Sequence, residues 1–189
     1  MSIKTLSLSI ALLLVFSFPV MADVGVSKLV PAKYQTKPIV ANMVYYVDRT
    51  FTITSFPDEL KGAIMIMTGN DDKASKGAGF VTFNIDQSAT VYIAHDSRGE
   101  TAKGGVSPDW LTKDFTFVNG KVIEVSDTNM GTFNLWKKDF GAGPVSLGGN
   151  ADPPAAGQGS MYLVLLTPPK LASVKSLGKV ATKWAEIKN

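Results

Sequence analysis

The sequence lacks cysteine and contains a single histidine. Without cysteine there is no disulfide bond, no thiolate metal site and no lipid-modified N-terminal cysteine, and one histidine excludes the histidine clusters of zinc sites. The hydrophobic core alone must therefore hold the fold together. For an exported chain of this length, the lack of disulfides favours a bacterial envelope or extracellular protein.

Long apolar runs are also scarce, and the one that stands out lies at the start of the chain. Lys4 is followed by the apolar stretch Ile10–Phe16, and Ala22 provides a small residue at a suitable cleavage position. This pattern predicts a secretory signal peptide over residues 1–22, and hence a secreted or periplasmic protein. No later run approaches the roughly 20 apolar residues of a membrane span, so we expect no transmembrane segment.

The body of the chain lacks a clear excess of either positive or negative charge. Residues 23–169 carry 13 Lys and Arg against 15 Asp and Glu, whereas residues 170–189 carry five Lys and one Glu. A nucleic-acid-binding domain usually presents a basic face, so the near-neutral body predicts no nucleic-acid partner. Apolar residues recur every three or four positions in the tail, which predicts a basic amphipathic helix over residues 170–189.

The body shows the alternation of apolar and polar residues that is typical of β-strands. We expect about eight or nine short strands, separated by turns rich in Gly, Asn and Pro, and almost no helix. Residues 44–169 are therefore predicted to form an all-β, antiparallel β-sandwich, jelly-roll-like in type. The predicted strands are Val44–Thr54, Gly62–Thr68, Phe80–Ile85, Val91–Asp96, Phe115–Val118, Lys121–Ser126, Thr132–Lys138, Val145–Leu147 and Ser160–Thr167.

Three connections carry further expectations. Residues 86–88 are short enough for a hairpin, and Asn119-Gly120 is the strongest hairpin signal in the chain. Pro108 predicts a helical turn that includes Trp110 and Leu111. Residues 23–43 contain two prolines and no clear periodicity, so we expect a loosely attached arm or a single edge strand, which offers a route to self-association.

The polar, charged and aromatic residues best suited to bind a ligand lie near the end of one predicted strand. Tyr92 lies on the strand, His95, Asp96 and Arg98 end it, and Asp109 and Trp110 follow a Gly-rich loop. We predict that these six residues form a ligand-binding site, in which Trp110 stacks on a sugar ring and the polar groups bind its hydroxyls.

Each of these residues also has a structural interpretation. Trp110 can plug the end of the sandwich, and Arg98 can form an internal bridge to Asp72 or Asp109. Asp71 and Asp72 are either ligands for a structural calcium ion or part of a capped turn. His95 could act as a base only beside a nucleophile and an orienting carboxylate, and no nucleophile elbow is present. We therefore expect no catalytic residues and no other cofactor.

Residues 45–168 resemble an accessory β-sandwich module of bacterial extracellular and polysaccharide-associated proteins. The resemblance implies a non-catalytic domain that binds carbohydrate. The segments that carry it are Asp48-Arg49, Gly69–Lys73, Val91–Arg98, Pro108–Leu111, Lys138–Phe140, Leu147–Asn150 and Ser160–Tyr162.

Two functions of different classes follow from the sequence. The first is a secreted, non-catalytic module that recognises a glycan or cell-surface polymer through loops at strand ends. The alternative is a structural or assembly subunit of the bacterial envelope or extracellular matrix, in which residues 23–43 add as a strand to a neighbouring sheet. A third function, carriage of an apolar ligand, is disfavoured by bulky residues that fill the predicted core, such as Met65, Phe83 and Met161.

Overall fold

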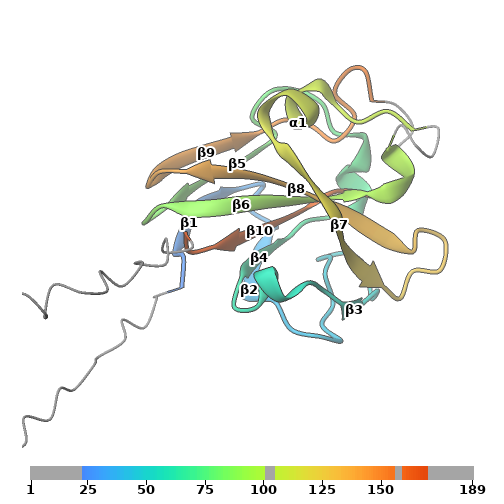
Figure 1. The fold of residues 1–189 in the computed structure, drawn as a ribbon. Coiled ribbons are helices and arrows are strands. Elements are labelled where there is room, and N and C mark those ends of the chain that lie inside the picture. Colours follow the sequence, from blue (N-terminus) through green and yellow to red (C-terminus); the bar gives the residue numbers. More distant parts are fainter. Residues whose placement is uncertain (1–22, 101–104, 156–158, 170–189) are drawn as a thin grey trace, which may run out of the picture.

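The computed structural model describes residues 23–100, 105–155 and 159–169, and it confirms an all-β protein with antiparallel sheets (Figure 1). The predicted signal peptide and tail helix lie outside these residues. The strands are β1 Val26–Val30, β2 Gln35–Pro38, β3 Ile53–Ser55, β4 Ile64–Met67, β5 Val81–Ile85, β6 Ala89–Asp96, β7 Thr116–Val125, β8 Thr132–Phe140, β9 Gly143–Leu147 and β10 Leu163–Thr167. The helical elements are η1 Asp58–Leu60, η2 Asn70–Ala74, η3 Ser97–Gly99 and α1 Asp109–Asp114.

The strands form two sheets of unequal size. The small sheet has the order β1-β5-β9, and the large one has the order β2-β4-β10-β6-β8-β7-β3 and curls into a half-barrel (Figure 1). All five residues of β10 are buried, as expected of an unbroken apolar run, and the strand lies between β4 and β6. Side chains from both sheets join one continuous core.

Segment 39–60 adds to this core. Tyr45 and Tyr46 are fully buried, and the Tyr45 ring meets Phe133 of β8 edge-on at 5.6 Å. The hydroxyl of Tyr46 donates to the carbonyl of Met161. The long strand predicted here is wrong: Val44 and Tyr46 form only isolated bridges, and β3 begins at Ile53. Tyr45 and Tyr46 are consecutive and both buried, so this segment lacks the one-sided burial that an alternating pattern predicts.

Residues 23–43 are integral to the fold: in place of the expected loose arm or single edge strand, the segment forms two edge strands, one in each sheet. β1 pairs with β5 in the small sheet, and β2 pairs with β4 at the edge of the large sheet. Tyr34 and Ile39, which flank β2, are buried in the core. The segment therefore contributes one strand to each sheet.

Both predicted hairpins are wrong. Residues 86–88 carry the chain from β5 in the small sheet to β6 in the large one. Asn119 and Gly120 lie inside β7, where the register with β8 shifts between Phe117 and Val122. Gly120 has φ +70°, a left-handed conformation that serves a bulge as well as a turn. The helical turn predicted after Pro108 is confirmed by α1.

No helix among the described residues is long and apolar enough to cross a membrane.

Candidate functional site

The structure separates the six predicted site residues: four of them lie in three places, His95 is buried, and Asp109 lies at the surface. Side chains alternate between the two faces of a strand, so Tyr92 and Asp96 of β6 point to one face and His95 to the other. Asp96 and Arg98 belong to a loop cluster, Tyr92 lines a cleft on the large sheet, and Trp110 lines a separate hollow.

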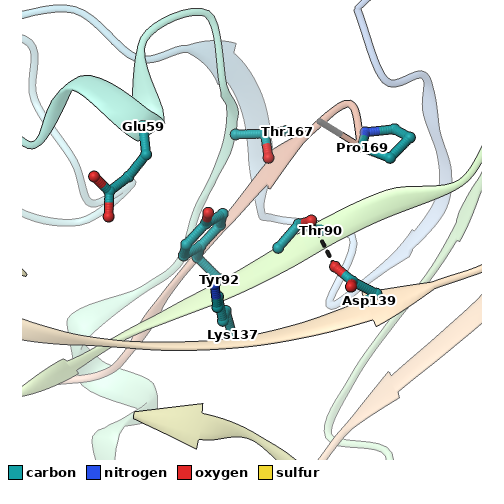
Figure 2. Close-up of a pocket in the computed structure, with 7 residues that line it drawn as sticks. All are labelled: Glu59, Thr90, Tyr92, Lys137, Asp139, Thr167 and Pro169. Carbon is teal, nitrogen blue, oxygen red and sulfur yellow. Dashed lines mark hydrogen bonds between the residues drawn. The ribbon is translucent and has the colours of Figure 1, made fainter. Parts of the chain in front are cut away.

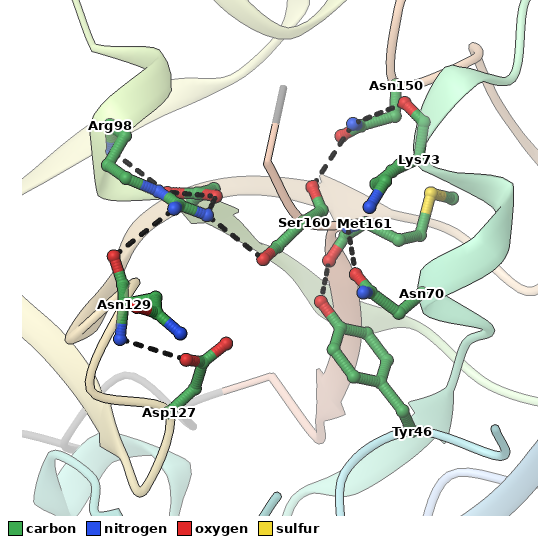
Figure 3. Close-up of polar contacts among 10 residues, drawn as sticks. Tyr46, Asn70, Lys73, Arg98, Asp127, Asn129, Asn150, Ser160 and Met161 are labelled. Carbon is green, nitrogen blue, oxygen red and sulfur yellow. Dashed lines mark hydrogen bonds and ion pairs between the residues drawn. The ribbon is translucent and has the colours of Figure 1, made fainter. Parts of the chain in front are cut away.

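Arg98 lies at the centre of the loop cluster, where it bonds to Asn129 and Ser160 from other segments (Figure 3). Its main partner is Asp96. Asp96 is fully buried and accepts hydrogen bonds from Nε of Arg98 at 3.0 Å and from Nη2 at 2.6 Å. Nη1 donates to the carbonyl of Asn129 at 3.2 Å, and Nη2 donates to Oγ of Ser160 at 3.3 Å. The hydrogen bond to Asp96 raises the pKa of Arg98.

This geometry supports the structural interpretation of Arg98 and corrects its partner. The guanidinium pairs with Asp96, two residues earlier, and neither Asp72 nor Asp109 takes part. Asp109 lies at the surface, where its carboxylate accepts from Lys113 at 2.6 Å on the next turn of α1. It is placed outside both cavities described below.

His95 is fully buried, so its imidazole is not displayed to a ligand. Within the described residues, neither ring nitrogen has a hydrogen-bond partner. Nδ1 lies 3.7 Å from Oε1 of Glu100, a contact longer than a hydrogen bond.

Asp71 and Asp72 face cations of the protein itself. Asp71 forms an ion pair with Arg49, which lowers the pKa of Asp71. Asp72 accepts from Nζ of Lys33 at 2.8 Å and from the hydroxyl of Tyr34 at 2.7 Å. In the part of the chain that the structure describes, no cluster of three or more His, Asp or Glu residues is placed to hold a metal ion.

Trp110 opens onto a space of about 210 Å³ that we call the aromatic hollow. The indole is anchored, because Nε1 donates to the carbonyl of Gly149 at 3.0 Å and the ring meets Tyr162 edge-on at 5.5 Å. It nevertheless remains partly exposed. The hollow is lined by Ala78, Gly79, Trp110, Asp114, Phe115, Lys138, Phe140, Ser146, Gly148 and Asp152.

Two phenylalanines and one lysine extend this aromatic wall, and none of the three was among the six predicted site residues. Nζ of Lys138 lies 5.8 Å from the ring centroid of Phe115 and 5.3 Å from that of Phe140, within cation–π range. Phe115 and Trp110 meet edge-on at 5.9 Å. Further along β7, Phe117 is 41% exposed and packs on Trp136 at 5.1 Å. The alternation of Phe115 and Phe117 is the signal that could have revealed this wall.

A second space, of about 300 Å³, is shown in Figure 2. Its β8 residues alternate with those of the hollow, so it lies on the opposite face of the large sheet. We call it the sheet cleft, and it is lined by Glu59, Thr90, Tyr92, Lys137, Asp139, Thr167 and Pro169. The hydroxyl of Thr90 donates to Oδ1 of Asp139 at 2.6 Å. Burial raises the pKa of Tyr92, and the nearby carboxylates of Glu59 and Asp139 add to the effect. Of the predicted site residues, Tyr92 is the one in this cleft.

The chain resembles parts of two glycoside hydrolases in fold. No family model and no curated protein matches its sequence. A β-glucuronidase from glycoside hydrolase family 2 superposes with a TM-score of 0.64 at 19% identity, over 77% of this chain and 14% of the enzyme. A GH138 enzyme targeting pectin rhamnogalacturonan II gives a TM-score of 0.51 at 11% identity, over 79% and 17%. This chain spans less than a fifth of either enzyme, and the likeness is one of fold.

Proposed function

We propose that the protein is a non-catalytic module that binds a glycan or a cell-surface polymer at the aromatic hollow. The observation that carries this proposal is the meeting of Trp110, Phe115 and Phe140 around one open space with Lys138 and Asp114 at its wall. The likeness of the fold to parts of two glycoside hydrolases supports it. The jelly-roll type of sandwich expected from the sequence belongs to the same proposal.

The chemistry of the hollow suits a sugar ring. Aromatic rings offer a flat apolar surface to the C–H face of a pyranose, and a few convergent polar groups then fix the hydroxyls. The ammonium of Lys138 donates and the exposed carboxylate of Asp114 accepts. Asp152 serves the scaffold instead, because it accepts from the backbone N–H of Gly77 at 2.6 Å and of Gly149 at 2.8 Å.

In this proposal the loop cluster of Asp96 and Arg98 is a frame for the site. Its contacts hold the loops at the strand ends, and recognition takes place at the wall formed by α1 and β8. The sequence predicted that loops at strand ends bind the ligand. The present proposal limits this prediction to the loops around Trp110.

The absence of catalysis is part of the proposal and is supported by two observations. His95 is enclosed, and Asp96 is held by Arg98. Pure protein incubated with plant and bacterial polysaccharides should release no new reducing ends. Release that is lost in Glu59→Gln or Asp139→Asn would show the module to be an enzyme.

We also propose that the chain is exported, and N-terminal sequencing of the secreted or periplasmic form should begin at Asp23.

Binding is tested on a glycan array. Affinity electrophoresis then measures retention in gels that contain the polysaccharides to which the protein binds. Phe140→Ala and Lys138→Ala should weaken retention by roughly tenfold, since each removes part of the ligand surface. Trp110→Phe keeps a ring packed on Tyr162 and should weaken it less than Trp110→Ala. The matched control is Phe56→Ala, a partly buried phenylalanine outside the hollow. Equal retention of all variants, with unfolding midpoints recorded in parallel, would overturn the proposed site.

The assembly function remains a second candidate because of β2. All four of its residues are exposed, and it forms one edge of the large sheet, where backbone groups are open to a further strand. A strand added there would give oligomers in size-exclusion chromatography, and Thr36→Pro would abolish them. A monomer at all concentrations removes this candidate.

A further inference from the structure

The sheet cleft has a lining that the proposed glycan site does not use. β8 sends Lys138 and Phe140 to the aromatic hollow, whereas Lys137 and Asp139 point to the opposite face and line the cleft. The two spaces are therefore separate sites on one strand.

The cleft brings together donors and acceptors from several elements (Figure 2). Thr90 and Tyr92 of β6 and Thr167 of β10 provide hydroxyls, Glu59 of η1 and Asp139 of β8 provide carboxylates, and Lys137 provides an ammonium. Pro169 supplies an apolar lip. A space of about 300 Å³ with such a lining fits the lower end of small-molecule sites.

The electrostatic character of the cleft is set by its two carboxylates. Tyr92 is only 5% exposed, and its pKa is raised by burial first and then by the negative charges of Glu59 and Asp139. The lining as a whole carries two carboxylates against the one ammonium of Lys137. Such a site favours a cationic donor and repels a carboxylate.

Glu59 already accepts an ammonium group. Nζ of Lys121 lies 3.5 Å from its Oε2, but the Lys121 side chain is 48% exposed, so this pair is weak and easily exchanged. On Asp139, the structure shows one hydrogen bond among the described residues, from Thr90 to Oδ1. Both carboxylates thus retain acceptor capacity for a ligand.

We propose that the sheet cleft binds an amino sugar with a free ammonium group, such as a glucosamine unit. The ammonium is held by Glu59 in place of Lys121, and the ring hydroxyls bond to Asp139, Thr90, Thr167 and Lys137. The hydroxyl groups of the cleft select a sugar over a lysine side chain, because a bare alkyl ammonium leaves them without ligand partners. This site goes beyond the proposed function and does not depend on the aromatic hollow.

The test is an NMR titration of ¹⁵N-labelled protein, read at the amides of β6 and β8. D-glucosamine and its β-1,4 oligomers should shift these amides at pH 6, where the amine is charged. Glucose, N-acetylglucosamine and glucuronate should bind at least tenfold more weakly, since each lacks the ammonium and the last carries a repelled carboxylate.

Variants locate the site. Glu59→Gln and Asp139→Asn should each reduce glucosamine affinity roughly tenfold, and Lys121→Met should increase it because the competing ammonium is gone. Asp58→Asn is the matched control: it lies beside Glu59 on η1, but its carboxylate points to Lys61. Phe140→Ala, in the aromatic hollow, should leave glucosamine binding unchanged.

Two results would overturn the proposal. The first is titration of glucose or Nα-acetyl-lysine amide with the same affinity as glucosamine, which would mean that either the ammonium or the hydroxyls are not recognised. The second is unchanged glucosamine binding by folded Glu59→Gln and Asp139→Asn. Loss of polysaccharide binding in Phe140→Ala alone would concern only the aromatic hollow.

Discussion

Arg98 folds back onto Asp96, and Nη2 of the guanidinium lies 2.6 Å from Oδ2 of a carboxylate that has no exposed surface. The backbone N–H of Arg98 also donates to the same carboxylate, at 2.9 Å to Oδ1. The buried charge of Asp96 is thus paired with a residue only two positions away. The remaining guanidinium N–H groups bond to two other segments, at Asn129 and Ser160.

Removal of this guanidinium should destabilise the protein more than removal of a surface cation. Arg98→Ala leaves Asp96 buried without its counter-charge, and we expect a loss of about 2–4 kcal/mol in the free energy of unfolding. Lys61→Ala, which breaks the exposed pair with Asp58, should change it by less than about 0.5 kcal/mol. Urea unfolding followed by circular dichroism measures both, and equal midpoints for the two variants would refute the structural role of Arg98.

The tyrosines predict a loss of stability at alkaline pH. The chain has five tyrosines, and burial is the first cause that raises the pKa of Tyr34, Tyr45, Tyr46, Tyr92 and Tyr162. A raised folded-state pKa stabilises the protein fully below about pH 10, the pKa of an unfolded tyrosine, and this contribution is lost as the pH rises above it.

The measurement for this prediction is absorbance at 295 nm against pH, with circular dichroism on the same samples. Phenolate absorbance should stay low in the native protein above pH 10 and then rise in one step with loss of β-structure. Gradual titration of all five phenols near pH 10 in a folded protein would contradict the burial described here.

A chain that begins at Val44 should not fold. It lacks β1 and β2, and it also lacks Tyr34 and Ile39 from the core. A chain that begins at Asp23 keeps all of these residues and should show a cooperative thermal transition. Cooperative unfolding of the shorter chain at a similar temperature would restore the idea of a dispensable arm.

Gly120 should tolerate a side chain poorly for reasons of backbone conformation alone. Its φ is +70°, and a Cβ built there meets nothing within 4 Å. Gly120→Ala should therefore reduce the free energy of unfolding by about 1 kcal/mol through strain. Gly141→Ala is the control, since that site is equally open but has no positive φ. A neutral Gly120→Ala result in thermal unfolding would exclude strain at the bulge.

Elements with an unambiguous local pattern could be predicted from the sequence. The apolar run of β10 allowed only a central strand, and Pro108 marked the start of α1. The break at residues 86–88 was ambiguous, because a short polar link can reverse a strand within one sheet or carry it to another. Asn119-Gly120 misled because a bulge and a tight turn use the same left-handed backbone.

The residues of the candidate sites come together through the pairing of strands that are distant in the sequence. The sequence alone does not show which strands pair or in what register. Trp110 stood out by residue type, but Phe115, Lys138 and Phe140 join it only through the pairing of β7 with β8. Glu59 approaches Tyr92 from a segment 33 positions earlier in the printed sequence, so the sheet cleft had no local signature. His95 and Asp96 attracted attention as polar residues, and the half-barrel buries both.

The alternation of β8 has a mechanical consequence. The side chains of Lys138 and Phe140 point to one face of the strand, and those of Lys137 and Asp139 point to the other. Binding at both proposed sites would make the monomer bivalent, so that one molecule could join two polymer strands without forming an oligomer. Its mixtures with a polysaccharide that offers both kinds of unit should then gel or precipitate at a defined protein-to-polymer ratio.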